Sequence, residues 1–410
     1  MLNIEEALKA ILDHATPLTP VTMALDEAAG LVLAEDVTAR GNVPPFANSA
    51  MDGFAVLAAD IQQASEATPV RLHVLEDVPA GSVATQPVRP GTAIRIMTGA
   101  PLPDGADTVV HVEVTRTEGN DVLILLVLKN GANVRSAGED MMDGTIVLAA
   151  GTVLRPGEVG VCAAAGHANV TVYSRARVAV LTTGSELVDA AQVPGPGQIR
   201  DANAHSLRAQ VAAMGAKPVV FARVPDTRAA VRSVLEQALA QTDVVLTNGG
   251  ISVGDYDFVK DVLQEMGAEL IFWRIKQKPG KPMAFWTLGS SRIVGLPGNP
   301  VSSMVCAEEY VRPLVRRMMG HALLYRPVRT AILDERYAKG ADAGRTHFVR
   351  VRLQERDGIL HAALTGPQGS GILMSMALAA GIAVIPEDTP VVEAGQTIHV
   401  QLTDLPEDHS

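Results

Sequence analysis

The chain has 410 residues, of which 47% are hydrophobic and 19% are charged. This composition allows a sizeable core and excludes a disordered chain, and the length predicts two to four domains. The 34 basic and 45 acidic residues give a net charge of −11, and aromatic residues make up only 3%. We therefore expect no nucleic-acid partner, because the chain has neither a basic surface nor a supply of aromatic side chains for base stacking.

The ends and cysteines of the chain indicate its compartment. The N-terminus is amphipathic and acidic, unlike a signal peptide, and no apolar run approaches the roughly 20 residues that span a bilayer. Cys162 and Cys306 lie apart in Ala/Val-rich stretches, which predicts two buried thiols rather than a disulfide or a metal site. We predict a cytoplasmic protein with no membrane association.

The first part of the chain alternates between helical and β-type patterns. Apolar residues at helical spacing predict a helix over 3–14, and a shorter helix is expected around 24–29. Short β-type runs separated by Gly, Pro and Asp then predict a β-rich lobe. These runs are 70–75, 93–97, 108–114 and 122–128. A helix of small residues is predicted over 157–168.

From residue 176 strands and helices alternate with short connections, which predicts a parallel sheet covered by helices. The predicted strands are 177–181, 217–223, 243–247 and 292–296. The predicted helices are 206–214, 227–241, 258–266 and 301–319. After about residue 325 four further strands predict a C-terminal β domain, and these are 328–333, 346–353, 382–385 and 397–402.

Three loops at strand ends predict a ligand site. They are 182–186 (TTGSE), 247–255 (TNGGISVGD) and 296–300 (LPGNP). Ligands in open α/β sheets lie beyond the carboxyl ends of the strands, and glycines let backbone N–H groups approach a phosphate or another oxyanion. Each loop alone would be an ordinary strand-to-helix turn, but three together favour an oxyanion site.

Common nucleotide motifs do not explain these loops. Gly249 and Gly254 have the spacing of a phosphate-binding P-loop, but Asp255 stands where that motif requires lysine. No G-x-G-x-x-G opens a helix, so a Rossmann dinucleotide site is unsupported. We also find no HExxH and no CxxC, so no zinc site is expected. A single G-x-S-x-G occurs, at 250–254 within the second glycine loop, and we expect no serine nucleophile.

Charged residues gather near the loops. The acids Glu186, Asp226, Asp255 and Asp257 suit Mg²⁺ bound to phosphates, although any one of them alone could be a helix cap or a solvated side chain. Lys278 and Lys281 lie in a Pro/Gly turn that could aim two ammonium groups at an anion, and an exposed turn with solvated lysines is the equal alternative. In the β-rich lobe, 44–55, 95–101 and 138–140 are loops with polar tips that could close over a neighbouring site.

Taken in order, seven segments resemble one family. They are SAMDGFAV (49–56), RIMTGAPLPDGAD (95–107), LRPGEVG (154–160), TTGSEL (182–187), TNGGISVGDYDF (247–258), KPGKP (278–282) and GLPGNPVSS (295–303). The ordered set closely resembles the MoeA-type molybdopterin molybdenumtransferases of molybdenum cofactor synthesis, which are related to the C-terminal domain of gephyrin. The resemblance spans nearly the whole chain.

The resemblance implies a multidomain, elongated α/β plus β fold. Residues 1–45 with 147–175 would form a discontinuous N-terminal helical and linker domain that dimerises, and 46–146 the β-rich lobe. Residues 176–324 would form a molybdopterin-binding-like α/β domain with a parallel sheet, and 325–410 a C-terminal β-barrel-like domain.

The resemblance also implies an activity. Adenylylated molybdopterin and molybdate would be converted to the molybdenum cofactor with release of AMP, in the presence of Mg²⁺. It implies a homodimer whose active site lies between the α/β domain of one subunit and the β-rich lobe of the other. Molybdopterin adenylyltransferase and molybdoenzyme maturation factors are the expected partners.

The residues that match the family's functional positions fall into three groups. The catalytic group is Asp52, Thr98, Glu186, Asp226 and Asp257. The group expected to bind molybdate and the molybdopterin phosphate is Gly184, Gly249, Gly250, Ser252, Lys278, Lys281, Pro297, Gly298, Asn299, Pro300, Arg350 and Ser370. The group expected to bind metal is Glu186, Asp226, Asp255 and Asp257. Asp140 matches a further family acid, and Ser185 departs from the family by replacing a common acid.

Two other functions fit parts of the chain. A molybdopterin adenylyltransferase has a similar α/β domain but lacks the β-rich lobe and the C-terminal β domain, so the length argues against it. A non-catalytic scaffold of the gephyrin kind is disfavoured because Asp52, Asp257, Lys278 and Lys281 are all present.

Overall fold

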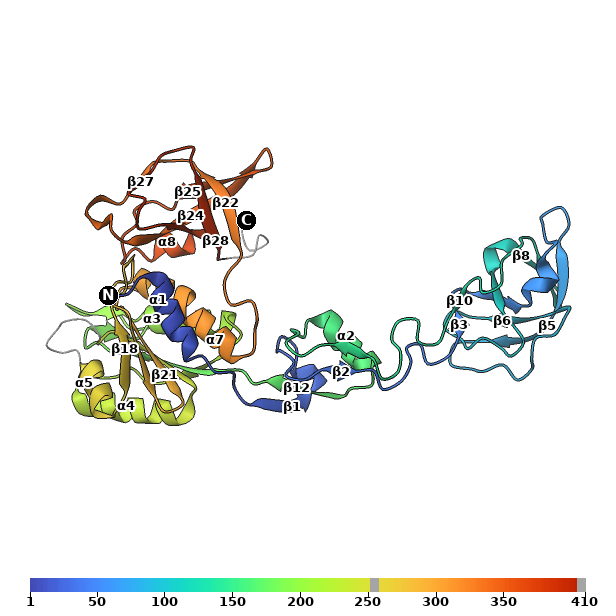
Figure 1. Cartoon of the computed structure of the whole chain (residues 1–410), viewed down its shortest axis with the longest axis horizontal. Helices are drawn as coiled ribbons and strands as arrows, with labels where there is room; N and C mark the ends of the chain where they lie inside the picture. The colour runs from blue at the N-terminus through green and yellow to red at the C-terminus, as the bar shows by residue number, and fades with distance from the viewer. Residues whose placement is uncertain (251–257, 404–410) are drawn as a thin grey trace. The chain divides into compact units, whose positions relative to one another are not determined.

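The computed structural model describes residues 1–250 and 258–403. The chain forms two compact units, one comprising Met1–Val21 with Tyr173–Ser410 and the other comprising Thr22–Val172. Figure 1 shows the elements along the chain.

A six-stranded sheet forms the centre of the first unit. In sheet order its strands are β16 (Lys217–Val220), β13 (Arg177–Thr182), β17 (Val244–Asn248), β21 (Ser291–Leu296), β20 (Ala284–Leu288) and β18 (Glu269–Trp273). The first four are parallel, which confirms the predicted α/β sheet. β20 and β18 are antiparallel and were missing from the prediction. The chain reverses there because Gly289, with φ +56°, and Ser290 form a two-residue hairpin turn between β20 and β21.

Helices cover both faces of this sheet (Figure 1). Successive strand residues point to opposite faces, so Val178 and Val180 join one apolar cluster while Ala179 and Leu181 join the other. Both faces are therefore apolar, as expected for buried parallel strands. The first cluster includes α1 (Ile4–Asp13), α3 (Asn203–Ala213) and α7 (Arg312–Met318), and the second includes α4 (Arg228–Gln241) and α5 (Phe258–Glu265).

The N-terminal helix α1 belongs to the first unit. Asn3 and Glu6 form a reciprocal capping box at its start, and Ala7 and Ile11 are fully buried against the α/β core. The sequence-based grouping placed residues 1–45 with 147–175, whereas the chain joins the second unit only from Thr22.

The predicted helix over 301–319 is interrupted. It consists of α6 (Pro300–Cys306), a π-helical turn η4 (Ala307–Val311) and α7. Pro313 lacks an N–H and its ring would collide with the carbonyl four residues earlier in a regular α-helix. The wider turn avoids this, and the N–H of Arg312 donates to the carbonyl of Ala307 five residues back. As a result Glu308, Glu309 and Tyr310 all face the protein interior.

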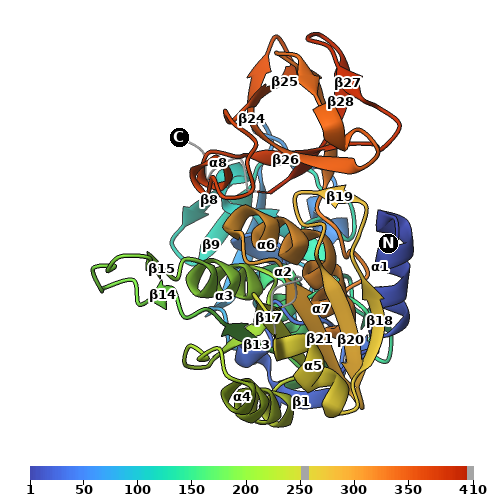
Figure 2. The ribbon, with the colours of Figure 1, turned by 90° about the vertical axis from the view of Figure 1, so that its left-hand side faces the viewer.

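A closed five-stranded barrel follows, which confirms the predicted C-terminal β-barrel-like region (Figure 2). Its strands in order are β24 (Thr346–Arg356), β25 (Ile359–Leu364), β22 (Val328–Leu333), β28 (Thr397–Leu402) and β26 (Gly381–Ile385), and β26 pairs back with β24. β25 was not predicted. A short strand from the α/β part, β19 (Gln277–Lys278), pairs with β24 and so ties the two parts together.

The second unit contains the predicted β-rich sheet. Its order is β7 (Thr108–His111), β4 (Gly53–Val56), β6 (Thr92–Ile96), β5 (Val70–Val78), β9 (Asp121–Ile124) and β8 (Thr115–Glu118). Two predicted runs are shorter in the structure. The run 108–114 turns into a 3-10 helix at Val112, and the run 122–128 leaves the sheet after Ile124.

The other strands and the α-helix of the second unit are short. These are β1 (Pro20–Ala24), β2 (Val37–Thr38), β3 (Asn48–Ser49), β10 (Val134–Arg135), β11 (Ile146–Leu148), α2 (Pro156–Ala164) and β12 (Asn169–Tyr173). The helix predicted around 24–29 is a single 3-10 turn, Leu25–Glu27. α2 ends before the predicted residue 168 because Gly166, with φ +87°, turns the chain away. Within the described ranges, no helix has both the length and the apolar character needed to cross a membrane.

The buried acid Glu309 predicts a pH-dependent stability. Burial raises the pKa of Glu309 to about 8, and its carboxylate oxygen accepts a hydrogen bond from Gln401 at 3.1 Å. An unfolded glutamate loses its proton near pH 4–5, so unfolding between about pH 5 and 8 releases a proton and stability falls as the pH rises. Glu309→Gln should remove this contribution, so its melting temperature should fall less than that of the wild type across this window.

Thermal unfolding of the full chain at several pH values measures this difference. Glu5→Gln, on the exposed face of α1, is the matched control and should follow the wild type. Parallel curves for the wild type and Glu309→Gln would contradict the prediction.

Candidate functional site

The three predicted loops leave the sheet at one edge. Thr182 at the end of β13 is in register with Asn248 at the end of β17, and Asn248 is in register with Leu296 at the end of β21. The loops that follow therefore begin side by side, as predicted from the parallel strands. The backbone continues the pairing, because the N–H of Thr183 donates to the carbonyl of Asn248 at 3.1 Å.

Two glycines after β17 are required by close packing. Gly249 and Gly250 have φ of +89° and +69°, a region that disfavours side chains. A Cβ on Gly249 would lie 2.9 Å from the carbonyl oxygen of Thr183, and one on Gly250 would lie 2.6 Å from a methyl group of Val259. Glycine thus lets this loop lie against the neighbouring loop and against α5.

Asparagine side chains join the loops below this edge. Asn203, in the first turn of α3, donates to the side-chain oxygen of Asn248 at 2.7 Å and to the carbonyl of Gly298 at 2.7 Å. Asn248 donates to the carbonyl of Pro297 at 2.6 Å and to the hydroxyl of Ser303 at 2.5 Å. These buried bonds fix the course of the Pro297–Pro300 loop relative to the end of β17.

Two predicted acids, Glu186 and Asp226, line one cavity of about 650 Å³. Asp226 accepts a hydrogen bond from the backbone N–H of Ser185 at 2.7 Å. The cap of α4 is instead Thr227, which accepts from the N–H of Ala230, so the Asp226 carboxylate remains directed to the loop after β13. Gly184 lies at the same place, since a Cβ there would meet the Glu186 carboxylate.

This pair suits a partial Mg²⁺ site. Mg²⁺ in proteins is commonly held by one or two carboxylates together with substrate phosphates and water. Within residues 1–250 and 258–403 no cluster of three or more His, Cys, Asp or Glu side chains has the arrangement of a metal site. The predicted Ser252, Asp255 and Asp257 lie outside the described residues.

The turn that carries the two predicted lysines, residues 277–282, is called the lysine turn below. It is held in place by buried polar side chains. The side-chain N–H of Gln277, which is fully buried, donates to the carbonyl of Pro279 at 3.0 Å and to the sulfur of Cys306 at 3.3 Å. Its carbonyl accepts from the hydroxyl of Tyr310 in the π-helical turn. Gly280 has no space for a side chain, because a Cβ would lie 2.4 Å from the Cys306 sulfur. The turn is therefore rigidly seated on α6 and η4.

Lys278 and Lys281 are presented differently by this turn. The ammonium of Lys278 forms an ion pair with Asp342 at 2.9 Å, from the 3-10 turn η5 (Gly340–Asp342) of the barrel part. Lys281 is half-buried and its carbonyl accepts from the N–H of Ile275 at 3.0 Å. Pro279 and Gly280 between them are buried, so the backbone of the turn is packed against the protein while the Lys278 side chain remains 44% exposed.

The predicted barrel residues lie beside the Pro297–Pro300 loop. The amide of Asn299 donates to the hydroxyl of Ser370 at 3.0 Å, and the N–H of Val301 donates to the carbonyl of Ser370 at 3.1 Å. Arg350 is buried, and its guanidinium donates to the carbonyl of Gly369 at 3.2 Å and the hydroxyl of Ser375 at 3.2 Å. Burial lowers the pKa of Arg350 to about 10, so it remains charged at neutral pH while it supports the Ser370 loop.

In the second unit, two predicted residues contact each other. The backbone N–H and the hydroxyl of Thr98 both donate to one carboxylate oxygen of Asp52 at 2.7 Å. The backbone hydrogen bond from Thr98 is the main cause that lowers the pKa of Asp52, so the exposed carboxylate is ionised. Asp140 lines a separate cavity in this unit with Arg135 and Glu139.

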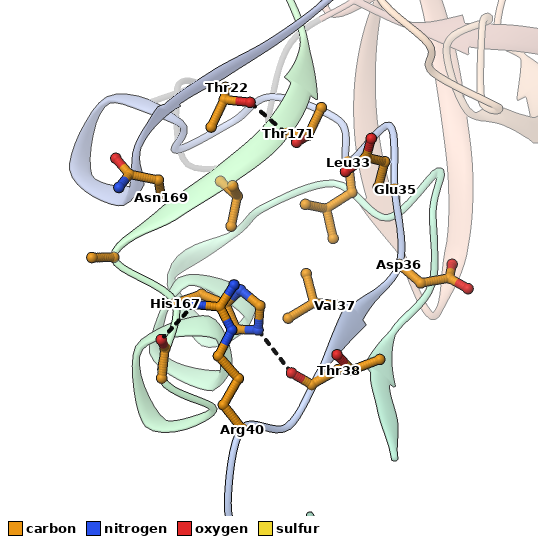
Figure 3. Close-up of a pocket in the computed structure, with 13 residues that line it drawn as sticks. Thr22, Leu33, Glu35, Asp36, Val37, Thr38, Arg40, His167, Asn169 and Thr171 are labelled. Carbon is orange, nitrogen blue, oxygen red and sulfur yellow. Dashed lines mark hydrogen bonds between the residues drawn. The ribbon is translucent and has the colours of Figure 1, made fainter. Parts of the chain in front are cut away.

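A further polar pocket of about 450 Å³ lies between the short strands of the second unit (Figure 3). His167 contacts the carbonyl of Thr38 at 2.7 Å, and the hydroxyls of Thr22 and Thr171 lie 3.3 Å apart. Arg40 donates to the carbonyl of Gly166 at 3.4 Å. None of the predicted site residues lines this pocket.

The sequence did not single out Asn203, Gln277 or Ser303. Gln277 and Ser303 are buried and Asn203 is half-buried, and each holds a predicted loop by hydrogen bonds from a segment that otherwise contributes to the core. A polar residue at a core-facing position was the available signal.

The comparisons with known proteins cover the whole chain. Residues 2–166 match the family model "MoeA N-terminal region (domain I and II)", residues 179–317 match "Probable molybdopterin binding domain", and residues 330–403 match "MoeA C-terminal region (domain IV)".

Full-length relatives and a solved structure agree with these matches. The chain is 37% identical to molybdopterin molybdenumtransferase 2 of Mycobacterium tuberculosis H37Rv, over 98% of this chain and 99% of the relative. It is 32% identical to molybdopterin molybdenumtransferase of Bacillus subtilis, over 98% and 94%. The crystal structure of a molybdopterin biosynthesis MoeA protein from Pyrococcus horikoshii OT3 has a TM-score of 0.82 and 31% identity, and covers 98% of this chain and all of that one.

The hydrogen bonds of Gln277 under the lysine turn predict an effect on stability. Gln277→Met keeps the side-chain volume but leaves the Tyr310 hydroxyl and the Pro279 carbonyl without their partner. Unsatisfied buried polar groups cost about 1–3 kcal/mol each, so the free energy of unfolding should fall by at least that amount. Denaturant unfolding of the full chain measures it. Gln237→Met on the exposed face of α4 is the control, and equal losses in the two variants would contradict the prediction.

Proposed function

This chain belongs to the molybdopterin molybdenumtransferase (MoeA) family, and we propose that it inserts molybdenum into molybdopterin during synthesis of the molybdenum cofactor. The substrates are adenylylated molybdopterin and molybdate, and the second product is AMP. The observation that supports this most directly is that the glycine loop that begins at Asn248, the lysine turn and the Ser370 loop all contact α6 or the residues just before it. Oxyanion-binding elements from distant parts of the chain thus lie around one short helix.

The molybdate dianion needs cations and hydrogen-bond donors. Lys278 and Lys281 supply ammonium groups from a turn that Gln277 holds in place, and Ser370 supplies a hydroxyl. Arg350 acts through the Ser370 loop, whose Gly369 carbonyl it binds, and its charge adds to the local positive potential. Ser252 is proposed as a further donor from its match to the family.

The phosphates of molybdopterin and AMP would lie over the glycine loops. Gly184, Gly249, Gly250 and Gly298 keep the backbone free of side chains there, while Pro297 and Pro300 shape the loop rather than react. Glu186 and Asp226 would hold Mg²⁺ from one side, with Asp255 and Asp257 as the remaining proposed ligands. When bound, Mg²⁺ supplies charge neutralisation at the pyrophosphate.

The reaction requires no protein nucleophile. The pyrophosphate linkage between molybdopterin and AMP is hydrolysed with the assistance of the bound molybdate, and AMP leaves. The two dithiolene thiols replace one oxo group of molybdate, whose oxygen departs with both thiol protons as water. This balances the water consumed in the hydrolysis, and molybdenum keeps its oxidation state. The residues of this chain hold both anions close together and stabilise the charge that develops on the leaving phosphate.

We also propose a cytoplasmic homodimer in which each active site uses two subunits. Asp52 and Thr98 would be presented by the β-rich lobe of one subunit to the α/β part of the other. The ionised, exposed carboxylate of Asp52 has a free oxygen for such a contact, because Thr98 occupies only the other one. Asp140 is a further candidate in that lobe. Molybdopterin adenylyltransferase would supply the substrate, and molybdoenzyme maturation factors would receive the product.

The proposed reaction predicts molybdate-dependent release of AMP. The purified chain, with adenylylated molybdopterin and Mg²⁺, should release AMP at a rate that rises and saturates with molybdate. Lys281→Ala should raise the half-saturating molybdate concentration roughly tenfold or more, because a hydrogen bond to a charged group is lost. Lys9→Ala, which removes an exposed ion pair on α1, should leave it unchanged.

Two results would count against this function. AMP release at background rate with and without molybdate would exclude the transferase activity. Unchanged molybdate saturation in Lys281→Ala would exclude the anion-binding role of the lysine turn.

A shared active site predicts complementation between subunits. Asp52→Ala and Lys281→Ala should each be weakly active alone, because each damages every site of its dimer. Mixed dimers contain one undamaged site, so a statistical mixture should recover roughly a quarter of wild-type activity. Differently tagged subunits allow the heterodimer to be purified and assayed. A purified heterodimer with no recovered activity would place the whole site within one chain.

A further inference from the structure

The ion pair between Lys278 and Asp342 lies where the oxyanion is proposed to bind. The two charged groups are 2.9 Å apart, and the second carboxylate oxygen of Asp342 lies 3.0 Å from the guanidinium of Arg345. The Lys278 side chain is 44% exposed, so a solute can reach its ammonium. Asp342 is therefore paired with an accessible cation, Lys278, which the proposed function expects to bind the substrate anion.

The barrel part fixes the position of this carboxylate. The carbonyl of Asp342 accepts from the ring N–H of His347 at 3.2 Å and from the N–H of Arg345 at 3.2 Å. Beside it, the buried ammonium of Lys339 donates to the carbonyl of Arg345 at 2.7 Å. The hydrogen bond from Lys278 is the main cause that lowers the pKa of Asp342, so the group is ionised at neutral pH. The carboxylate is thus presented by a braced turn and not by a freely moving side chain.

Arg345 makes the exchange of partners possible. When an anion takes Lys278, Asp342 keeps its second cation and is not left as an unpaired charge. The carboxylate must be displaced before any anion can bind Lys278, so the ion pair lowers the affinity of the site for every anion. A dianion such as molybdate can still make the exchange, because the attraction to an ammonium grows with the charge of the anion.

We propose that Asp342 is a resident competitor for Lys278, which lowers the affinity of the anion site until an oxyanion displaces it. This inference rests on the proposed anion-binding role of Lys278. It assigns to the barrel part a function in setting the affinity of the anion site, in addition to the contacts of Ser370.

Titration calorimetry with the full-length protein tests this without relying on turnover. Molybdate is the divalent probe and nitrate the monovalent one. Asp342→Asn should bind molybdate roughly two- to fivefold more tightly, the range expected for a half-exposed ion pair. Nitrate, which must displace the same carboxylate, should gain by a similar factor. Asp13→Asn, which removes the exposed pair with Lys9, should change neither.

A double-mutant cycle separates competition from a structural role. In a Lys278→Ala background, Asp342→Asn should have no effect on molybdate affinity, because the cation for which Asp342 competes is gone. Asp342→Ser serves the same purpose if the asparagine variant does not fold. Unchanged or weaker molybdate binding in the Asp342 variants, or the same effect with and without Lys278, would overturn the proposal.

The outcomes also distinguish this inference from the proposed function. If Lys278→Ala loses molybdate affinity while the Asp342 variants match the wild type, only the role of Asp342 fails. If the wild type binds no molybdate, or Lys278→Ala binds it as the wild type does, the proposed anion site fails and the role of Asp342 fails with it.

Discussion

The candidate site depends on the short helix α6, which is packed on several sides at once. The hydroxyl of Ser303 in α6 accepts a hydrogen bond from Asn248 at the end of β17. The sulfur of Cys306 in α6 lies against Gln277 and Gly280 of the lysine turn. Val301 and Val305 pack on Phe348 and Ile382 of the barrel. Because interiors are close-packed, moving this helix would displace the glycine loops, the lysine turn and the Ser370 loop together. The geometry of the anion-binding groups is therefore set by packing far more than by the loops themselves.

The π-helical turn after α6 extends this dependence to the barrel. A regular helix would place Tyr310 and Glu309 at different angles around the axis, whereas the wider turn directs the Tyr310 hydroxyl to Gln277 and the Glu309 carboxyl to Gln401 of β28. Such turns commonly occur at functional sites. Glu308 pairs with Arg326 at 2.7 Å in the connection that leads to the barrel. One irregularity, which avoids the clash of Pro313, thus supports the lysine turn on one side and the barrel on the other.

The sequence was sufficient to predict the parts of the site that follow from the succession of strands and helices along the chain. Parallel strands put the loops after Thr182, Asn248 and Leu296 at one edge whatever surrounds them, so their proximity was predictable. The antiparallel strands β18 and β20 were missed because residues 269–288 lack the strand–helix alternation on which the prediction relied. The burial of Arg350 and the pairing of Lys278 with Asp342 depend on how the barrel docks, which no local pattern records. The same holds for Asn203, whose partners lie 45 and 95 residues away.

The arrangement also explains how a chain of net charge −11 can present an anion site. Two of its cations near α6, Lys278 and Arg350, are not surplus charges in a positive patch, since each has a built-in partner. Lys278 pairs with a carboxylate, and the Arg350 guanidinium is surrounded by carbonyl and hydroxyl oxygens. Holding cations this way limits the cost of leaving them partly buried before substrate arrives. Binding of a dianion then becomes an exchange of partners within a preformed frame. The affinity for that dianion depends on how firmly the resident acid is held, and in this chain the barrel turn that ends at Arg345 holds it.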